Sequence, residues 1–121
     1  MKPTFIALLA LFLCLPLAGA DKKPLTKEES AEVIEAAIRK AAKKPTGELT
    51  KADLERVTKL NLIRNQLTSV TGLEKLTQLT FLNLDYNQLT DVKKLENLTQ
   101  LRNLNLGNNQ LTDVKGLEKL T

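Results

Sequence analysis

A repeat of 22 residues fills the second half of this 121-residue chain and constrains its fold more than any other feature. One copy runs over residues 57–78, the next over 79–100, and a third over 101–121, one residue short of a full copy. The second and third copies are identical at 15 of 21 aligned positions. A fixed period of this length is typical of a solenoid, in which each copy forms one coil stacked on its neighbours. Folds of this kind present extended surfaces for binding and rarely carry out catalysis.

The first 20 residues have the features of a secretory signal peptide. Lys2 provides a positive start, residues 5–17 form an apolar run, and residues 18–20 (Ala-Gly-Ala) form a small-residue cleavage site. A membrane-spanning helix needs about 20 apolar residues, whereas this run is shorter and contains Pro16. We therefore expect cleavage before Asp21, a secreted location in the periplasm or outside the cell, and no stable membrane insertion of the mature chain. An uncleaved membrane anchor is the alternative.

The composition of the mature chain argues against several kinds of chemistry. Without residues 1–20 the chain has 17 basic and 14 acidic residues, and it loses Cys14, its only cysteine, which leaves no disulfide framework. The sequence has no histidine, and no base is apparent beside either serine of the mature chain, Ser30 or Ser69. We therefore predict that the protein is not an enzyme and has no cofactor. A net charge of +3 is too modest to indicate a nucleic-acid partner.

Residues 21–56 are predicted to form a linker followed by a helical cap. Thr26 and Glu29 have the spacing of a capping box, and Pro45 and Gly47 stop the helix, which we place over residues 27–43. The apolar residues of one helical face are Val33, Ile34, Ala37, Ile38 and Ala41.

A second, weaker capping signal at Thr50 and Asp53 predicts a short helix over residues 51–56 with Leu54 facing inward. The end coil of a solenoid has an uncovered apolar face, so we interpret both helices as its N-terminal cap. A membrane-surface helix is the alternative, but the apolar face is mostly alanine and carries no Trp or Phe.

The leucines of each repeat predict a short strand and a tight return path. Leu82 and Leu84 are two residues apart, which places both on one face of a strand with Asn83 on the other. The second half of the copy keeps apolar residues at a spacing of three, which suits an extended or 3₁₀ path. Stacked coils would pair their strands into a parallel sheet, giving an α/β solenoid. The leucines expected to point into the core are Leu60, Leu62, Leu82, Leu84, Leu104 and Leu106.

One asparagine recurs at the turn after each strand, as Asn65, Asn87 and Asn109. An inward-pointing asparagine at a turn can accept from and donate to backbone groups that the strand leaves unpaired. Stacked coils would align these side chains in a ladder. We therefore predict a structural role for them and not a ligand-binding one.

The repeat pattern Leu-x-x-Leu-x-Leu-x-x-Asn-x-Leu resembles the leucine-rich repeat, and the 22-residue form with Asn-Gln-Leu-Thr-Asp-Val resembles the bacterial internalin-like subclass. The resemblance covers residues 57–121, with Val57 in place of the first leucine, and the helical segment resembles the N-terminal caps of exported bacterial leucine-rich repeat proteins. It implies a parallel sheet on a concave face, a 3₁₀ or extended convex side, and protein binding through the concave face. The pattern is carried in the middle copy by Leu79, Leu82, Leu84, Asn87 and Leu89.

The resemblance directs attention to the outward positions of the strands, which form columns across the three copies. Phe81, Tyr86 and Ile63 beside Arg64 have the composition of a binding hot spot. Scattered exposed apolar residues are also ordinary on protein surfaces, so both interpretations stay open. The candidate protein-binding residues are Lys59, Asn61, Ile63, Arg64, Phe81, Asn83, Asp85, Tyr86, Asn103, Asn105 and Asn108.

Two polar columns allow other interpretations. Asp91 and Asp113 stack at the return turn, but Ser69 breaks that column, so we predict N-caps and no metal site. A second column has amides about 4.8 Å apart, which could bond one another or a sugar. Carbohydrate is a less favoured partner than protein. The residues of the amide column are Asn61, Asn83 and Asn105.

These features together predict an exported scaffold that binds a protein of unknown identity through the concave face. The alternative is a capped N-terminal fragment of a longer repeat protein, with no binding activity of its own. The third copy has one side uncovered and an unpaired strand edge over residues 102–106. We therefore expect the isolated chain to fray from Leu111 onward or to self-associate end to end.

Overall fold

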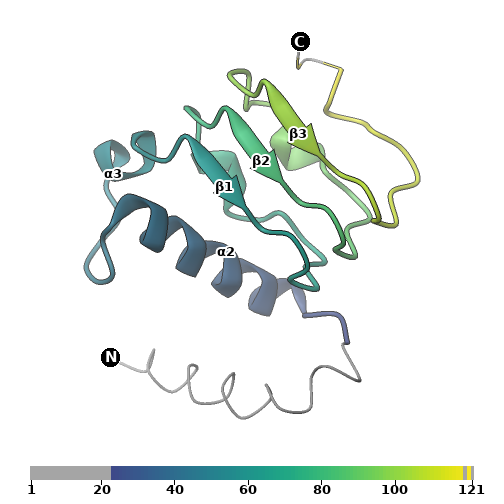
Figure 1. The fold of residues 1–121 in the computed structure, drawn as a ribbon, viewed down its shortest axis with the longest axis horizontal. Coiled ribbons are helices and arrows are strands. Elements are labelled where there is room, and N and C mark those ends of the chain that lie inside the picture. The colour runs from purple at the N-terminus through teal and green to yellow at the C-terminus, as the bar shows by residue number, and fades with distance from the viewer. Residues whose placement is uncertain (1–22, 119, 121) are drawn as a thin grey trace.

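A computed structural model describes residues 23–118 and residue 120, and the predicted signal peptide lies outside the described residues (Figure 1). Three short strands follow two helices, and a 3₁₀ turn separates successive strands. The elements are α2 (Lys27–Ala42), α3 (Lys51–Glu55), β1 (Lys59–Asn61), η1 (Leu73–Lys75), β2 (Phe81–Asn83), η2 (Lys93–Leu95) and β3 (Asn103–Asn105).

Helix α2 begins at the predicted capping box. The backbone N–H of Glu29 donates to Thr26 Oγ1, and the backbone N–H of Thr26 donates to Glu29 Oε2, both at 3.1 Å. The helix ends one residue earlier than predicted because Lys43 adopts a left-handed conformation with φ of 58°. Its backbone N–H bonds the carbonyls of Arg39 and Lys40, which satisfies groups that a helix end leaves unpaired.

The buried face of α2 differs from the predicted face at its C-terminal end. A row with a spacing of four is buried, namely Ser30, Ile34, Ile38 and Ala42. Val33 and Ala37 lie half-buried beside this row, whereas Ala41, which was predicted on the same apolar face, is exposed. The row follows the i, i+4 periodicity from Ile34, and that period places Ala42 in the core instead.

Helix α3 is fastened to α2 by a buried carboxylate, Asp53. Its Oδ2 accepts from Lys44 Nζ at 2.8 Å and from the backbone N–H and Oγ1 of Thr50 at 2.8 and 2.9 Å. The hydrogen bond from Lys44, followed by those from Thr50, holds the pKa of Asp53 well below its ordinary value of 3.8. Arg56 Nη2 also donates to the carbonyl of Ala42 at 2.7 Å, at the end of α2. The capping box at Thr50 therefore starts α3, and its Asp53 also connects α3 to the end of α2 through Lys44.

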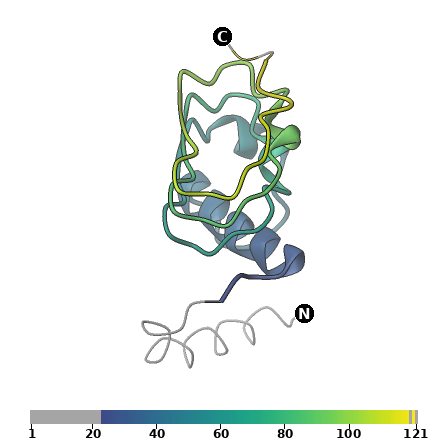
Figure 2. The ribbon, with the colours of Figure 1, turned by 90° about the vertical axis from the view of Figure 1, so that its right-hand side faces the viewer.

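The three strands form one parallel sheet in the order β1-β2-β3. Viewed nearly along the stack, the coils overlie one another, and α2 lies at the end of the stack that carries β1 (Figures 1 and 2). The fold is a leucine-rich repeat solenoid with a helical N-terminal cap, as predicted. Because α2 covers the first coil, Leu60 and Leu62 are buried although no coil precedes them.

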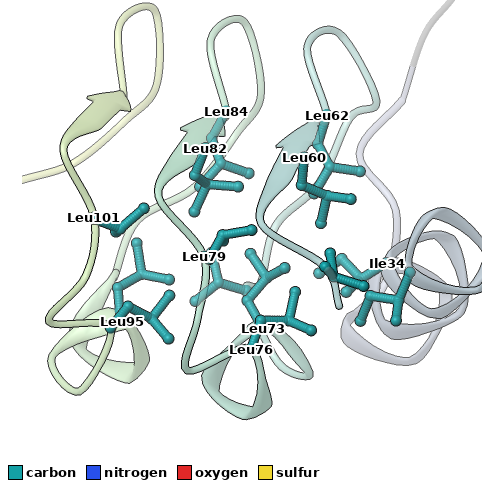
Figure 3. Packing of buried hydrophobic residues seen from close by; sticks show 14 of the residues in the cluster. Ile34, Leu60, Leu62, Leu73, Leu76, Leu79, Leu82, Leu84, Leu95 and Leu101 are labelled. Atoms are coloured by element: carbon teal, nitrogen blue, oxygen red, sulfur yellow. The ribbon is translucent and has the colours of Figure 1, made fainter. Parts of the chain in front are cut away.

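The core is a set of aliphatic rows that run from the cap into the third coil. Figure 3 shows these side chains filling the interior from Ile34 of α2 to Leu101. Leu82 and Leu84 of the middle coil are fully buried. Their equivalents Leu104 and Leu106 pack against the core but stay half-buried, because none of the described residues covers the far side of the third coil.

The asparagine ladder is confirmed for the second and third coils. Asn87 is buried; its Nδ2 donates to the carbonyls of Leu62 and Leu84 at 2.9 Å, and its Oδ1 accepts from the backbone N–H groups of Asn65 and Leu67 at 3.0 Å. Asn109, which is half-buried, repeats most of the pattern one coil later: its Nδ2 donates to the carbonyls of Leu84 and Leu106, and its Oδ1 accepts from the backbone N–H of Leu89. Asn65, in the first coil, is only half-buried and donates to the carbonyl of Ile63, because no coil precedes it.

The return side has the predicted 3₁₀ character, but its turns differ between coils. η1 starts after Gly72, which has φ of 108°, a left-handed conformation that glycine adopts without steric cost. The middle coil has Lys94 at the equivalent position, and there the 3₁₀ turn starts two residues earlier in the repeat, at Lys93. The local path of the return side therefore differs between copies while the overall stack is kept.

Candidate protein-binding face

The outward side chains of the three strands and of the turns that follow them form one surface, which we call the strand face. The sheet register pairs Lys59 with Phe81 and Phe81 with Asn103, as the repeat alignment predicted. It likewise aligns the amide column of Asn61, Asn83 and Asn105. The candidate residues on the strands are therefore neighbours in space, although they are 22 residues apart in the chain.

Exposed apolar side chains gather on the strand face. Among the described residues, four large hydrophobic side chains are exposed, and three of them are the predicted Ile63 (37%), Phe81 (36%) and Tyr86 (47%). The fourth, Val114, is on the return side. The guanidinium carbon of Arg64 lies 4.5 Å from the centre of the Tyr86 ring, which is the geometry of a cation–π contact. This contact holds both long side chains in place on the surface.

The turn after each strand places its candidate residue in an uncommon backbone conformation. Arg64, Tyr86 and Asn108 are equivalent positions, and their φ angles are 58°, 57° and 49°. Asparagine adopts this left-handed region readily, whereas it costs most other residues free energy. The backbone N–H of Arg64 bonds the carbonyl of Asp85 at 3.1 Å, which fixes the conformation. Departures from local preference of this kind cluster at functional sites.

The amide column has a structural role that the sequence analysis missed. The Oδ1 atoms of Asn61, Asn83 and Asn105 accept from the backbone N–H two residues further on, at 3.2, 3.0 and 2.9 Å. Each asparagine therefore fixes the turn that follows its own strand. The sequence left open whether these amides bond one another or a sugar; among the described residues, the hydrogen bonds of their oxygens go to the backbone of their own coil. The sequence analysis compared equivalent positions of different repeats, so it did not detect these hydrogen bonds, which form between residues of the same repeat.

The carboxylate of Asp85 is also held in place, by a hydrogen bond from the next coil. Its Oδ1 accepts from Asn108 Nδ2 at 2.9 Å in the next coil. A Cβ atom at Gly107 would lie 2.9 Å from the same oxygen, so glycine leaves the room that the carboxylate occupies. Asp85 and Asn108 thus form a linked polar pair at the turn end of the strand face.

A shallow hollow of about 440 Å³ surrounds Phe81 at the other end of the strand face. Three of its residues were not among the predicted candidates: Leu60, which was predicted as a core residue and is buried, and Thr80 and Arg102. Thr80 and Arg102 precede β2 and β3 by one residue, where two successive side chains face outward, so strict alternation along the strand misses them. The residues that line the hollow are Lys59, Leu60, Asn61, Thr80, Phe81, Arg102 and Asn103.

The aspartates of the return side fix turns, and the prediction that they are N-caps was wrong: η2 begins after Val92 without a side-chain cap, and none of the described residues after Asp113 forms a helix. Asp91 Oδ1 accepts from the backbone N–H of Lys93 at 2.7 Å, and Asp113 Oδ1 accepts from that of Lys115 at 3.0 Å. Ser69 makes the equivalent bond to the backbone N–H of Thr71 at 3.1 Å. Within residues 23–118 and 120, no three acidic, histidine or cysteine side chains come together in a way that could hold a metal ion.

A family model described as leucine-rich repeats in two copies matches residues 55–97 and again residues 77–119. The chain therefore belongs to the leucine-rich repeat family. Together with the 22-residue period and the solved structures below, this places it among bacterial internalin-like leucine-rich repeat proteins.

Two solved structures from Listeria monocytogenes are similar to this chain. An internalin (inlF) is 38% identical with a TM-score of 0.68 over 72% of this chain, and internalin C2 (inlC2) is 34% identical with a TM-score of 0.66 over 69%. The match spans only 26% and 38% of those two chains. The CBM51-2 and INT domains of Clostridium perfringens ZmpB are 33% identical, with a TM-score of 0.52 over 60% of this chain and 15% of that one. No match was found among curated proteins.

The helices in the described part of the chain are too short or too polar to cross a lipid bilayer.

Proposed function

We propose that this protein is an exported, non-enzymatic scaffold that binds another protein through its strand face. The observation that carries the proposal is the pair Arg64 and Tyr86, stacked on each other in left-handed backbone conformations. Asn108 occupies the same position in the third coil at lower conformational cost. An arginine and a tyrosine held there against local preference, beside exposed Phe81, supply the side chains that dominate binding hot spots.

Family membership supports a protein partner in general terms, because leucine-rich repeat solenoids stack into extended surfaces suited to binding. Carbohydrate is less favoured, since each Oδ1 of the amide column already accepts one backbone hydrogen bond and has fewer acceptor sites left for a sugar. We infer no catalytic role, in keeping with a sequence that lacks histidine.

Replacing Phe81 and Tyr86 together with alanine is expected to weaken capture of the partner at least about tenfold, since hot-spot truncations cost about 2 kcal/mol or more. The measurement is affinity capture from an extracytoplasmic extract, with bound protein quantified by mass spectrometry. Val114→Ala is the matched control, because it removes an exposed apolar side chain from the return side. Undiminished capture by the double variant would remove the strand face from the proposal.

Tyr86→Asn separates binding from folding at the same position. Asparagine suits the left-handed conformation, so the midpoint of urea unfolding of this variant should be at least as high as that of the natural protein. It should still lose capture, because the ring and its contact with Arg64 are gone. A variant that lost stability and capture together would point to a structural role for Tyr86.

Export is proposed from the signal-like residues 1–20. Protein isolated from its native host should have the intact mass of a chain that starts at Asp21. The uncleaved mass recovered in a membrane fraction would favour the anchor instead.

Two observations favour a second candidate function, in which the chain is the capped N-terminal part of a longer repeat protein and binds nothing alone. The third coil keeps Leu104 and Leu106 half-buried, and the chain spans 26% and 38% of the two internalins. The coding sequence after Thr121 tests this candidate, since further repeats there would support it.

A further inference from the structure

The hollow around Phe81 has two cations on its rim and no acidic residue in its lining. Lys59 comes from β1, and Arg102 directly precedes β3, so the two belong to the strands on either side of β2. Both residues are exposed, and neither forms an ion pair with another described residue. Phe81 itself is exposed over 36% of its surface.

The rest of the strand face does not neutralise this charge. Its one acidic side chain, Asp85, lies at the turn end and is bonded to Asn108. Neighbouring strands lie about 4.8 Å apart, so the backbones at Lys59 and Arg102 are about 10 Å apart across β2. Two separated cations that flank an apolar ring are complementary to two separated anions that flank an apolar side chain.

We propose that this hollow receives a short acidic segment of the partner protein. One apolar side chain of that segment packs on Phe81, and carboxylates near it in the sequence pair with Lys59 and Arg102. The inference rests on the proposed function and adds the chemistry of the partner. Alternate residues of an extended peptide lie about 6.6 Å apart and point to the same face, so acidic residues two positions before and two positions after the apolar one can reach the two cations.

Single-stranded nucleic acid also combines a stacking group with anions, and it is the competing occupant. It is disfavoured because binding of this kind uses a continuous basic groove with several stacking platforms. Here the third cation of the strand face, Arg64, is stacked on Tyr86 beside a carboxylate, and the remaining positions are mostly asparagine. The hollow offers two free cations and one ring, which is enough for a few peptide residues.

The test is selection of random displayed peptides of about a dozen residues on the immobilised protein at physiological salt. The selected peptides should place Asp or Glu within two positions of an aliphatic or aromatic residue. The double variant Lys59→Gln and Arg102→Gln should bind these peptides about 1.5- to 5-fold more weakly for each cation removed, as exposed charge pairs do. It should also select peptides without the acidic preference.

The matched control is Lys75→Gln with Lys94→Gln, which removes two exposed cations from the return side and should leave peptide affinity unchanged. Circular dichroism of all variants checks that the fold is kept. Selected peptides without acidic residues, equal losses in both double variants, or displacement of the peptides by oligo-dT would each overturn the inference.

The outcomes also separate this inference from the proposed function. Peptides that depend on Phe81 and Tyr86 but lack acidic residues would contradict the inference of an acidic partner segment, and they would still support the strand face as a binding surface. Failure to select any peptide that depends on these two aromatic residues would count against both.

Discussion

Replacing Asn87 with alanine is expected to lower the free energy of unfolding by about 3–5 kcal/mol, because several buried backbone groups lose their partner at about 1–3 kcal/mol or less for each group. The amide donates to carbonyls of two coils, Leu62 and Leu84, and accepts from the N–H groups of Asn65 and Leu67. Alanine would leave these backbone groups without partners in the interior. Urea unfolding followed by circular dichroism measures the loss.

Asn65→Ala is the control for that experiment. Asn65 holds the same position in the first coil but is half-buried, with one bond to the carbonyl of Ile63 at 3.1 Å. Its replacement should cost about 1 kcal/mol, as for a single hydrogen bond. Equal losses for the two variants would contradict the view that the ladder is built from contacts between coils. Since whole domains are stable by only about 5–15 kcal/mol, the Asn87 variant should lose a large share of the total free energy of unfolding.

Leu84→Ala and Leu106→Ala are expected to differ although the two leucines are equivalent in the repeat. Leu84 is fully buried between coils, so its truncation should cost about 2–5 kcal/mol. Leu106 is half-buried, so its loss should cost about half as much. Urea unfolding gives both values, and hydrogen exchange should show the amides of the third coil less protected than those of Leu82 and Leu84.

Equal costs for the two leucines would mean that something covers the third coil in solution. Size-exclusion chromatography with light scattering then decides whether a second copy of the chain does so, which is the end-to-end association that the sequence predicted. A designed fourth copy joined after Thr121 provides the complementary control. It should raise the cost of Leu106→Ala to that of Leu84→Ala.

Much of the fold follows from the sequence because the repeat imposes the same environment three times. The spacing of Leu82 and Leu84 specifies a strand with one buried face, and the recurrence of Asn87 at a turn specifies a backbone partner. The capping box at Thr26 is local and needs no knowledge of the tertiary structure. These predictions succeed because each of the three features is determined by one local rule: strand periodicity, pairing of backbone groups at a turn, or helix capping.

The candidate site is less visible in the sequence because its features depend on tertiary contacts. Positive φ is usually signalled by glycine or asparagine, and Arg64 and Tyr86 carry no such signal. The hydrogen bonds of the amide column lie within each repeat, where identity between copies fits several roles equally well. Arg102 joins the hollow only because the chain turns a corner before β3, which breaks the alternation of strand side chains.

The asparagine ladder has a direction, and that direction bears on how such genes change length. Asn87 completes the backbone of the coil before it, and Asn109 does the same for the middle coil through the carbonyl of Leu84 and the N–H of Leu89. Each of these copies therefore supplies the asparagine that satisfies the unpaired backbone groups of the copy before it. Duplication of a whole copy inserts a unit that both neighbours can accept, whereas gain or loss of part of a copy breaks the succession. Recombination between near-identical copies can thus lengthen or shorten the array in whole coils, and each product stays a folded stack.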